Sequence, residues 1–298
     1  MPAETALIVF PLAAALLFAI AAIVLKHSSQ CGAGVWQTTL VVNLIAAVSY
    51  SMLWGLGGPP IQVELLWQPA LIAVCLFGGM ATQFIALEKG DVSIAVPVLG
   101  LKVIFVALLT PLLSGESVGF GLWIAAILSV AGVAILNRSD ASGAAGQGVT
   151  PALAAGGCAA VCFALFDLLV QEWGPIWGTG RLLPCIFWMN GLLSLLFAKV
   201  CHVSLRSVPR QAWRSLVIGS LLISLQSGLF VGCLSIYGKA TAANIIYSSR
   251  GLLSVLLAWA WASWFTSSRE LASASVTGWR VTGAVVLLVA VAIASLLK

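Results

Sequence analysis

Ten long apolar segments, separated by short polar breaks, dominate this sequence. Each is long enough for a helix that crosses a bilayer, which needs about 20 mostly apolar residues. They run over 6–25, 35–56, 66–87, 92–113, 119–136, 152–172, 182–199, 213–236, 241–265 and 278–297. They lack the alternation of apolar and polar residues that a membrane β-barrel shows. The sequence therefore predicts an all-α integral membrane protein with ten transmembrane helices.

The composition excludes a soluble domain. Hydrophobic residues make up 61% of the 298 residues and charged residues only 8%, whereas soluble domains contain roughly a quarter charged residues. Disorder is excluded too, because disordered chains have low hydrophobicity. The net charge of +5 is spread along the chain, with no basic run suited to nucleic acid. We therefore expect the lipid bilayer and a small-molecule substrate as partners, and no nucleic acid.

The two halves of the chain share a layout. A Ser/Gly/Ala-rich linker at 138–150 separates five apolar segments in 1–137 from five in 151–298. Phe18 aligns with Phe163 at an offset of 145, Asn43 with Asn190 at 147, and Lys102 with Arg250 at 148. Because each unit has an odd number of helices, the second copy would be inverted in the membrane. The sequence thus predicts two inverted five-helix repeats.

Three ionisable residues lie well inside the apolar segments, namely Lys102, Arg250 and Asp167. Such groups are costly in a bilayer and therefore mark functional sites. Two cations and one acid leave a net positive charge, which suits an anionic or zwitterionic ligand. A structural ion pair with Asp167 is the alternative interpretation. Pro97 precedes Lys102 by about one turn and predicts a bend in that helix.

Several uncharged polar residues extend this candidate site. A hairpin turn at Gly238 would place Gln226 level with Arg250, because each lies 12 residues from the turn. Tyr247 shares a helix face with Arg250. For the aligned pair Asn43 and Asn190, a hydrogen bond between helices is as good an interpretation as ligand binding. The predicted substrate-binding residues are Lys102, Arg250, Asn43, Asn190, Gln83, Gln226, Asn244 and Tyr247, and Asp167 is the predicted coupling residue.

No pattern in the sequence indicates an enzyme or a metal site. The seven cysteines form no CxxC motif, and there is no His/Cys cluster, nucleotide-binding loop or Ser/His/Asp set. We therefore expect no catalytic residues, no bound metal and no cofactor.

Three motifs in the first half resemble a known family. They are Ala86-Leu87-Glu88-Lys89-Gly90-Asp91-Val92-Ser93-Ile94-Ala95-Val96-Pro97, then Ser114-Gly115-Glu116, then Gly132-Val133-Ala134-Ile135-Leu136. The pattern is similar to the EamA-type branch of the drug/metabolite transporter superfamily. This resemblance implies ten helices in two inverted repeats, a central cavity lined by helices 1–4 and 6–9, peripheral helices 5 and 10, and alternating access by rocking of helix pairs.

One branch of that superfamily, the plastid sugar-phosphate/phosphate exchangers, is similar in carrying cations on helices 4 and 9. Lys102 and Arg250 match those places, which implies an anionic substrate. The sequence also departs from the pattern, because Gln37 and Thr38 stand where many EamA-type members have an arginine near the start of helix 2.

These observations predict a secondary transporter of the inner membrane, working as an exporter of a small anionic or zwitterionic metabolite. A carboxylate or phosphate would bind between Lys102 and Arg250, as in an amino-acid-like compound or a multi-carboxylate chelator. A drug or cation/proton antiporter that uses Asp167 is the rival. A membrane enzyme or a Schiff-base photoreceptor with Lys102 as its amine is a further alternative, but such photoreceptors have seven helices.

The basic residues of the loops predict the orientation of the chain. Eight lie on the side of the membrane away from the chain ends, and three lie on the side of the ends. Because cytoplasmic loops carry an excess of lysine and arginine, we expect both ends outside the cytoplasm. The eight are Lys26, Lys89, Arg138, Lys199, Arg206, Arg210, Arg214 and Arg269, and the three are Arg181, Lys239 and Lys298.

Overall fold

The structure is a computed structural model that describes residues 2–89, 97–136, 149–254, 256–257 and 274–297. Within these ranges the regular elements are α-helices and short 3-10 turns, and no strand occurs. The all-α class predicted from the sequence is therefore confirmed. The predicted linker at 138–150 falls almost entirely outside the described residues, and the stretches 92–96 and 258–265 of two predicted helices fall entirely outside them.

Helical segments lie at all of the predicted apolar runs. The first half contains α1 (Ala3–Gln30), α2 (Val35–Ser51), α3 (Trp67–Lys89), α5 (Lys102–Leu113) and α6 (Phe120–Leu136). The second half contains α7 (Val149–Trp177), α8 (Thr179–Val200), α9 (Arg210–Tyr237), α10 (Ala240–Tyr247) and α12 (Ala274–Leu296). Three 3-10 turns, Met52–Leu56, Val63–Leu65 and Leu205–Ser207, cap or connect these helices.

The lengths and hydropathy of these helices fit a bilayer. In the described part of the chain, six helices are long and apolar enough to cross a membrane, and shorter apolar helices cover Pro97–Leu113, Phe120–Leu136 and Val281–Leu296. Large apolar side chains such as Leu196, Leu225 and Leu288 point outward and are more than half exposed. Such a surface suits lipid, and the protein is accordingly a multi-pass membrane protein.

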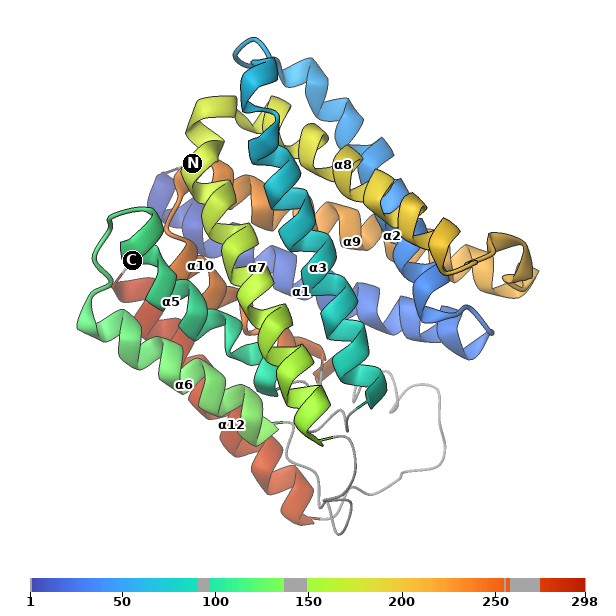
Figure 1. The fold of residues 1–298 in the computed structure, drawn as a ribbon. Coiled ribbons are helices and arrows are strands. Elements are labelled where there is room, and N and C mark those ends of the chain that lie inside the picture. Colours follow the sequence, from blue (N-terminus) through green and yellow to red (C-terminus); the bar gives the residue numbers. More distant parts are fainter. Residues whose placement is uncertain (1, 90–96, 137–148, 255, 258–273, 298) are drawn as a thin grey trace.

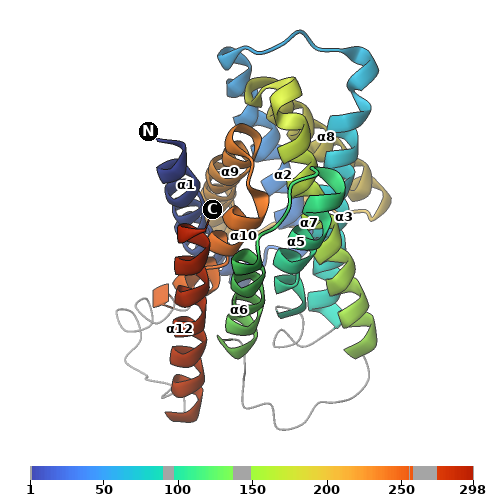
Figure 2. The same cartoon turned by 90° about the vertical axis from the view of Figure 1, so that its left-hand side faces the viewer.

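Helices of the two halves pack against each other, and the most extensive of these pairs stay packed pairs when every helix is replaced by its counterpart in the other half. α1 packs on α9, and α7, which corresponds to α1, packs on α3, which corresponds to α9. The pairs α2–α8 and α6–α12 map onto themselves. Figures 1 and 2 show α6 and α12 side by side at one edge of the molecule. This exchange symmetry supports the duplicated layout.

The direction of the corresponding helices fits inverted copies. Between α2 and α8, Asn43 hydrogen-bonds to Ser194, whereas Ser51, two turns later in α2, accepts a hydrogen bond from Trp188, which lies earlier in α8. The two helices therefore run antiparallel. Copies related by a two-fold axis in the membrane plane require this arrangement.

Candidate functional site

Lys102, Asp167 and Asn244 form a buried cluster between α5, α7 and α10. Lys102 Nζ lies 2.6 Å from Asp167 Oδ2, and the two side chains are 15% and 1% exposed. Asn244 Nδ2 donates to the same carboxylate oxygen at 2.6 Å. The other oxygen, Oδ1, is buried and has no hydrogen-bond partner among the described residues. Asp167 thus neutralises Lys102 and keeps one free acceptor.

Arg250 lies in an aromatic environment instead. Its guanidinium carbon is 4.7 Å from the ring centroid of Phe18 and 4.6 Å from that of Tyr247. In the part of the chain that the structure describes, no carboxylate forms an ion pair with it. Aromatic faces attract a cation by about 0.5–2 kcal/mol but do not neutralise it. Arg250 therefore keeps a positive charge that an anionic ligand can neutralise.

The two cations occupy equivalent positions in the two halves. Lys102 Nζ lies 5.9 Å from the ring centroid of Phe163, as Arg250 lies over Phe18. Phe18 and Phe163 are the aligned phenylalanines of the predicted repeat. Each cation therefore contacts the aligned phenylalanine that lies in the half opposite to its own. Asp167 breaks this symmetry, because its aligned residue is Ala22. The structure thus brings Lys102 and Arg250 into one site, near enough for their charges to interact.

A stacked pair of rings connects the surroundings of the two cations. Phe230 stacks on Tyr247 with centroids 4.4 Å apart, and Lys102 Nζ lies 5.5 Å from the centroid of Phe230. Tyr247 Oη donates to Gln226 Oε1 at 2.8 Å. Gln226 thus contacts a residue that precedes Arg250 by three positions, and its expected place level with Arg250 stays a prediction.

The helix that carries Lys102 is locally distorted immediately before this residue. Within the run Pro97–Leu113 the α-helical pattern breaks at Leu101, whose amide donates to the carbonyl of Val98, three residues back. Pro97 lacks an amide hydrogen, and Gly100 lowers the helix propensity just before the break. Leu101 keeps right-handed helical dihedrals, with φ −59° and ψ −14°, so the predicted helix continues through this irregular turn.

The helix that carries Arg250 is distorted at the equivalent place. Its regular part, α10, ends at Tyr247, Ser248 and Ser249 form a turn, and regular helical structure resumes at Arg250. The Ser248 hydroxyl donates to the carbonyl of Ile245 at 2.6 Å, which competes with the regular helical hydrogen bonds. Ser248 keeps right-handed helical dihedrals and its amide still donates to the carbonyl of Asn244, so the helix is distorted here and does not end.

Asn43 and Asn190 lie on α2 and α8, outside the charged cluster. Asn43 Nδ2 donates to Ser194 Oγ at 2.6 Å. Asn190 is fully buried, and neither polar atom of its side chain has a hydrogen-bond partner among the described residues. The residue that aligns with Ser194 is Ala47, which has no polar group to offer. The hydrogen bond between α2 and α8 accounts for the burial of the polar Asn43 side chain. Ligand binding by Asn43 or Asn190 stays a prediction.

The α3 helix contributes packing rather than charge to the site. A Cβ at Gly79 would lie 2.8 Å from the ring of Phe163, so this glycine lets α3 approach the ring that faces Lys102. Gln83, one turn further along α3, is half-buried and forms no hydrogen bond to the cluster within the described ranges. Its predicted role in substrate binding also stays a prediction.

Comparisons with known proteins agree with this architecture. No curated protein matches the chain. Among the solved structures that match, one described only as "Crystal structure of protein" has a TM-score of 0.74 and 18% sequence identity, over 98% of this chain and 99% of its own. At that identity the likeness shows the fold alone. Residues 5–138 match the model of the EamA-like transporter family. The resemblance predicted from the sequence is thereby confirmed over the first half of the chain, and the matched EamA-like transporter family is part of the drug/metabolite transporter superfamily.

Proposed function

We propose that the protein is a secondary-active transporter of the inner membrane, which exports a small metabolite with one carboxylate by alternating access. One observation carries the proposal. Arg250 has no acidic partner in the described structure, beside a Lys102–Asp167 pair that is already neutral. The three groups together leave one positive charge at membrane depth. A buried charge of this kind is costly unless a ligand neutralises it.

This charge balance favours a substrate with one net negative charge or a zwitterion. A carboxylate would neutralise the Arg250 guanidinium through two parallel hydrogen bonds. The amino group of a zwitterion would find an acceptor at Asp167 Oδ1, which has no partner among the described residues. A phosphate dianion or a multi-carboxylate chelator would leave surplus negative charge in the site, and is therefore the weaker candidate.

Asp167 fits the role of coupling residue. An anion that approaches Lys102 competes with Asp167, which lies 2.6 Å from the ammonium group. Two negative charges around one ammonium group repel each other strongly at low dielectric. Protonation of Asp167 removes that repulsion and frees Lys102 for the ligand. Binding of the anion to Lys102 is thus linked to uptake of a proton by Asp167.

A drug or cation/proton antiporter is the second candidate, and one observation favours it. The free oxygen of Asp167 could accept an organic cation in place of the carboxylate's present partner, Lys102. In that case the substrate would depend on Asp167, and Arg250 would only repel it.

The test is a ligand screen on the purified protein by thermal shift, with amino acids, monocarboxylates, dicarboxylates and organic cations. We expect carboxylates to stabilise the native protein, and Arg250→Gln to weaken their binding about ten- to a hundredfold, since one charge-assisted hydrogen bond contributes about 1.5–3 kcal/mol. Arg181→Gln is the matched control, because Arg181 also lies over an aromatic ring, that of Trp54, but at the start of α8. The Arg181→Gln variant should bind carboxylates with the affinity of the native protein.

Two results would overturn the proposal. Native carboxylate affinity in Arg250→Gln would exclude Arg250 as the anion site. Stabilisation by organic cations that disappears in Asp167→Asn and persists in Arg250→Gln would establish the antiporter instead. The direction of transport is then measured as efflux of the identified ligand from loaded cells, with Arg250→Gln as the inactive reference.

A further inference from the structure

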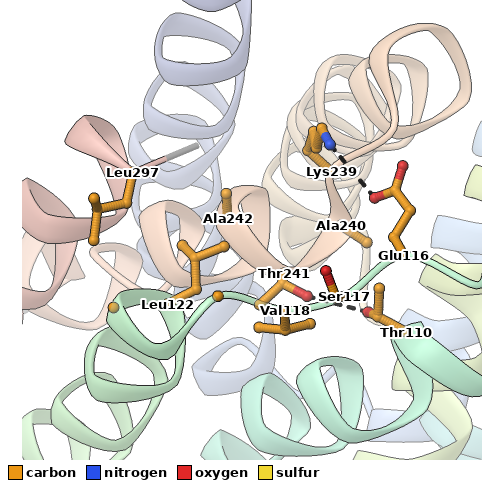
Figure 3. A pocket seen from close by; sticks show the side chains of 12 residues that line it. Thr110, Glu116, Ser117, Val118, Leu122, Lys239, Ala240, Thr241, Ala242 and Leu297 are labelled. Carbon is orange, nitrogen blue, oxygen red and sulfur yellow. Dashed lines mark hydrogen bonds and ion pairs between the residues drawn. The ribbon is translucent and has the colours of Figure 1, made fainter.

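Two contacts tie the loop after α5 to the turn between α9 and α10. Lys239 Nζ lies 3.5 Å from Glu116 Oε2, and Thr110 Oγ1 lies 3.1 Å from Thr241 Oγ1, as Figure 3 shows. Each contact joins one half of the chain to the other. A cavity of about 350 Å³ lies at this junction, and its lining includes all four of these residues and Leu297 at the end of α12.

Gln171 of α7 holds the same two segments together. Its Oε1 accepts a hydrogen bond from the amide of Ala240 at 2.7 Å, and its Nε2 donates to Ser114 Oγ at 3.4 Å. The side chain is 8% exposed. Gln171 follows Asp167 by four residues in a continuous helix, so the two share a face. One face of α7 thus connects α5 to α10 at two levels, through Asp167 in the site and through Gln171 at the junction.

This junction lies between the cavity and the two cations. Thr110 follows Lys102 by eight residues, or about 12 Å along α5, and Val106 lies between them on the same face. Thr241 precedes Arg250 by nine residues. A path from the cavity to the cations along the seam between α5 and α10 therefore passes the Thr110–Thr241 contact.

The turn at the junction has a strained backbone. Lys239 has a φ of 57° and follows Gly238, which has a φ of 69°. The left-handed conformation is unfavourable for a residue with a side chain, and it persists only where surrounding contacts hold it. The contacts available here are those to Glu116 and Gln171. Their loss would let the turn relax.

We propose that Gln171, the Glu116–Lys239 pair and the Thr110–Thr241 contact form the gate that closes the candidate site on the side of the chain ends. Gln171 is the positioning residue that links this gate to Asp167. When Asp167 releases Lys102, α7 is free to shift along α5, and the hydrogen bonds of Gln171 weaken with the same movement. This inference rests on the proposed transport function. Because the chain ends are predicted to lie outside the cytoplasm, this is the outer gate.

Access to a cysteine at position 106 tests the gate without any ligand. In Val106→Cys, a charged, membrane-impermeant thiol reagent is applied to each membrane face in turn, in spheroplasts and in inverted vesicles. Mass spectrometry separates the peptide of position 106 from those of the seven native cysteines. We expect slow labelling from the face of the chain ends. Adding Gln171→Leu should raise that rate about tenfold, which corresponds to about 1.4 kcal/mol.

Gln68→Leu is the matched control. Gln68 is also a buried glutamine, 7% exposed, and it accepts a hydrogen bond from Trp177 Nε1 at 2.8 Å between α3 and α7. Its loss breaks a buried hydrogen bond but leaves the contacts between α5 and α10 intact. Labelling of position 106 should therefore stay at the Val106→Cys rate.

A second variant decides the question if Gln171→Leu fails to fold. Glu116 and Lys239 are about half exposed, so Glu116→Gln with Lys239→Gln should fold normally, and should also raise the labelling rate. Unchanged labelling in every gate variant that folds, an equal rise in Gln68→Leu, or a rise from the opposite face alone would overturn the gate. None of these results concerns carboxylate binding at Arg250, so the gate and the proposed function can fail separately.

Discussion

Lys102 Nζ and Asp167 Oδ2 lie 2.6 Å apart, and this ion pair makes the two cations of the site inequivalent. The repeat places Lys102 and Arg250 at matching positions, each against the phenylalanine of the opposite half. Only Lys102 has a carboxylate beside it in the described structure. In the proposed function, an incoming anion would find a free charge at Arg250, and it would reach Lys102 only by displacing Asp167.

The ion pair predicts a characteristic pattern of stability. Lys102→Gln leaves a buried carboxylate without its cation, and breaking a buried pair in this way costs about 3–5 kcal/mol. Adding Asp167→Asn removes the stranded charge and should recover most of the loss. The measurement is the folding yield and the thermal midpoint of each purified variant. Lys239→Gln, which breaks an exposed pair, should change the midpoint little.

This prediction fails if Lys102→Gln keeps the native midpoint. It also fails if the double variant is no more stable than Lys102→Gln alone, because the two residues would then act independently.

The proposed coupling predicts how transport depends on pH. Protonation of Asp167 frees Lys102, so transport of a carboxylate should become faster as the pH falls. Asp167→Asn mimics the neutral carboxyl group and should flatten this dependence. The charged groups near Asp167 are Lys102 and Arg250, and neither is changed. Glu172→Gln is the control, because Glu172 is the next residue of α7 but is exposed. A pH profile that Asp167→Asn leaves unaltered would exclude Asp167 as the coupling residue.

The hydropathy of the sequence was enough to predict the membrane class and the position of each helical segment. These features depend on runs of about 20 residues, and single contacts hardly influence them. A repeat was also predicted, because matched residues such as Lys102 and Arg250 keep a nearly constant offset, and the exchange symmetry of the helix packing supports it. The same alignment contained Phe18 and Phe163, although their contact with the two cations could not be seen without the fold.

The distortions before the two cations were not predictable from the same signals. Leu101 and Ser249 lie in apolar surroundings, and a hydropathy pattern does not separate a regular helix from a locally distorted one. The sequence likewise did not predict which cation pairs with Asp167, since both Lys102 and Arg250 were candidates. That choice depends on how α7 faces α5 and α10, and so on distances between side chains that sequence spacing does not contain.

The contact of Gly79 with Phe163 predicts a sharp difference between two neighbouring glycines. A Cβ at Gly79 would lie 2.8 Å from the ring, whereas a Cβ at Gly78 would have Cys162 Sγ at 3.8 Å as its nearest atom. Gly79→Ala must therefore displace Phe163 or separate α3 from α7, and overpacking of this kind costs about 1–3 kcal/mol. Gly78→Ala should be tolerated. Equal thermal midpoints for the two variants would contradict the packing described here.

The unsatisfied side chain of Asn190 predicts a stabilising substitution. Ala47 stands where the repeat partner of Ser194 would stand, and it is 1% exposed. Ala47→Ser should supply the hydrogen bond that Asn43 already has with Ser194, with a gain of about 0.6 kcal/mol, the average for hydrogen bonds between membrane helices. The gain is measured as a rise in the thermal midpoint. It should vanish when Asn190→Leu is also present, because the serine then has no partner. No stabilisation in Ala47→Ser would show that Asn190 already has a partner in the membrane, such as a bound water or a ligand. Stabilisation that survives Asn190→Leu would show that the serine bonds to a group other than Asn190.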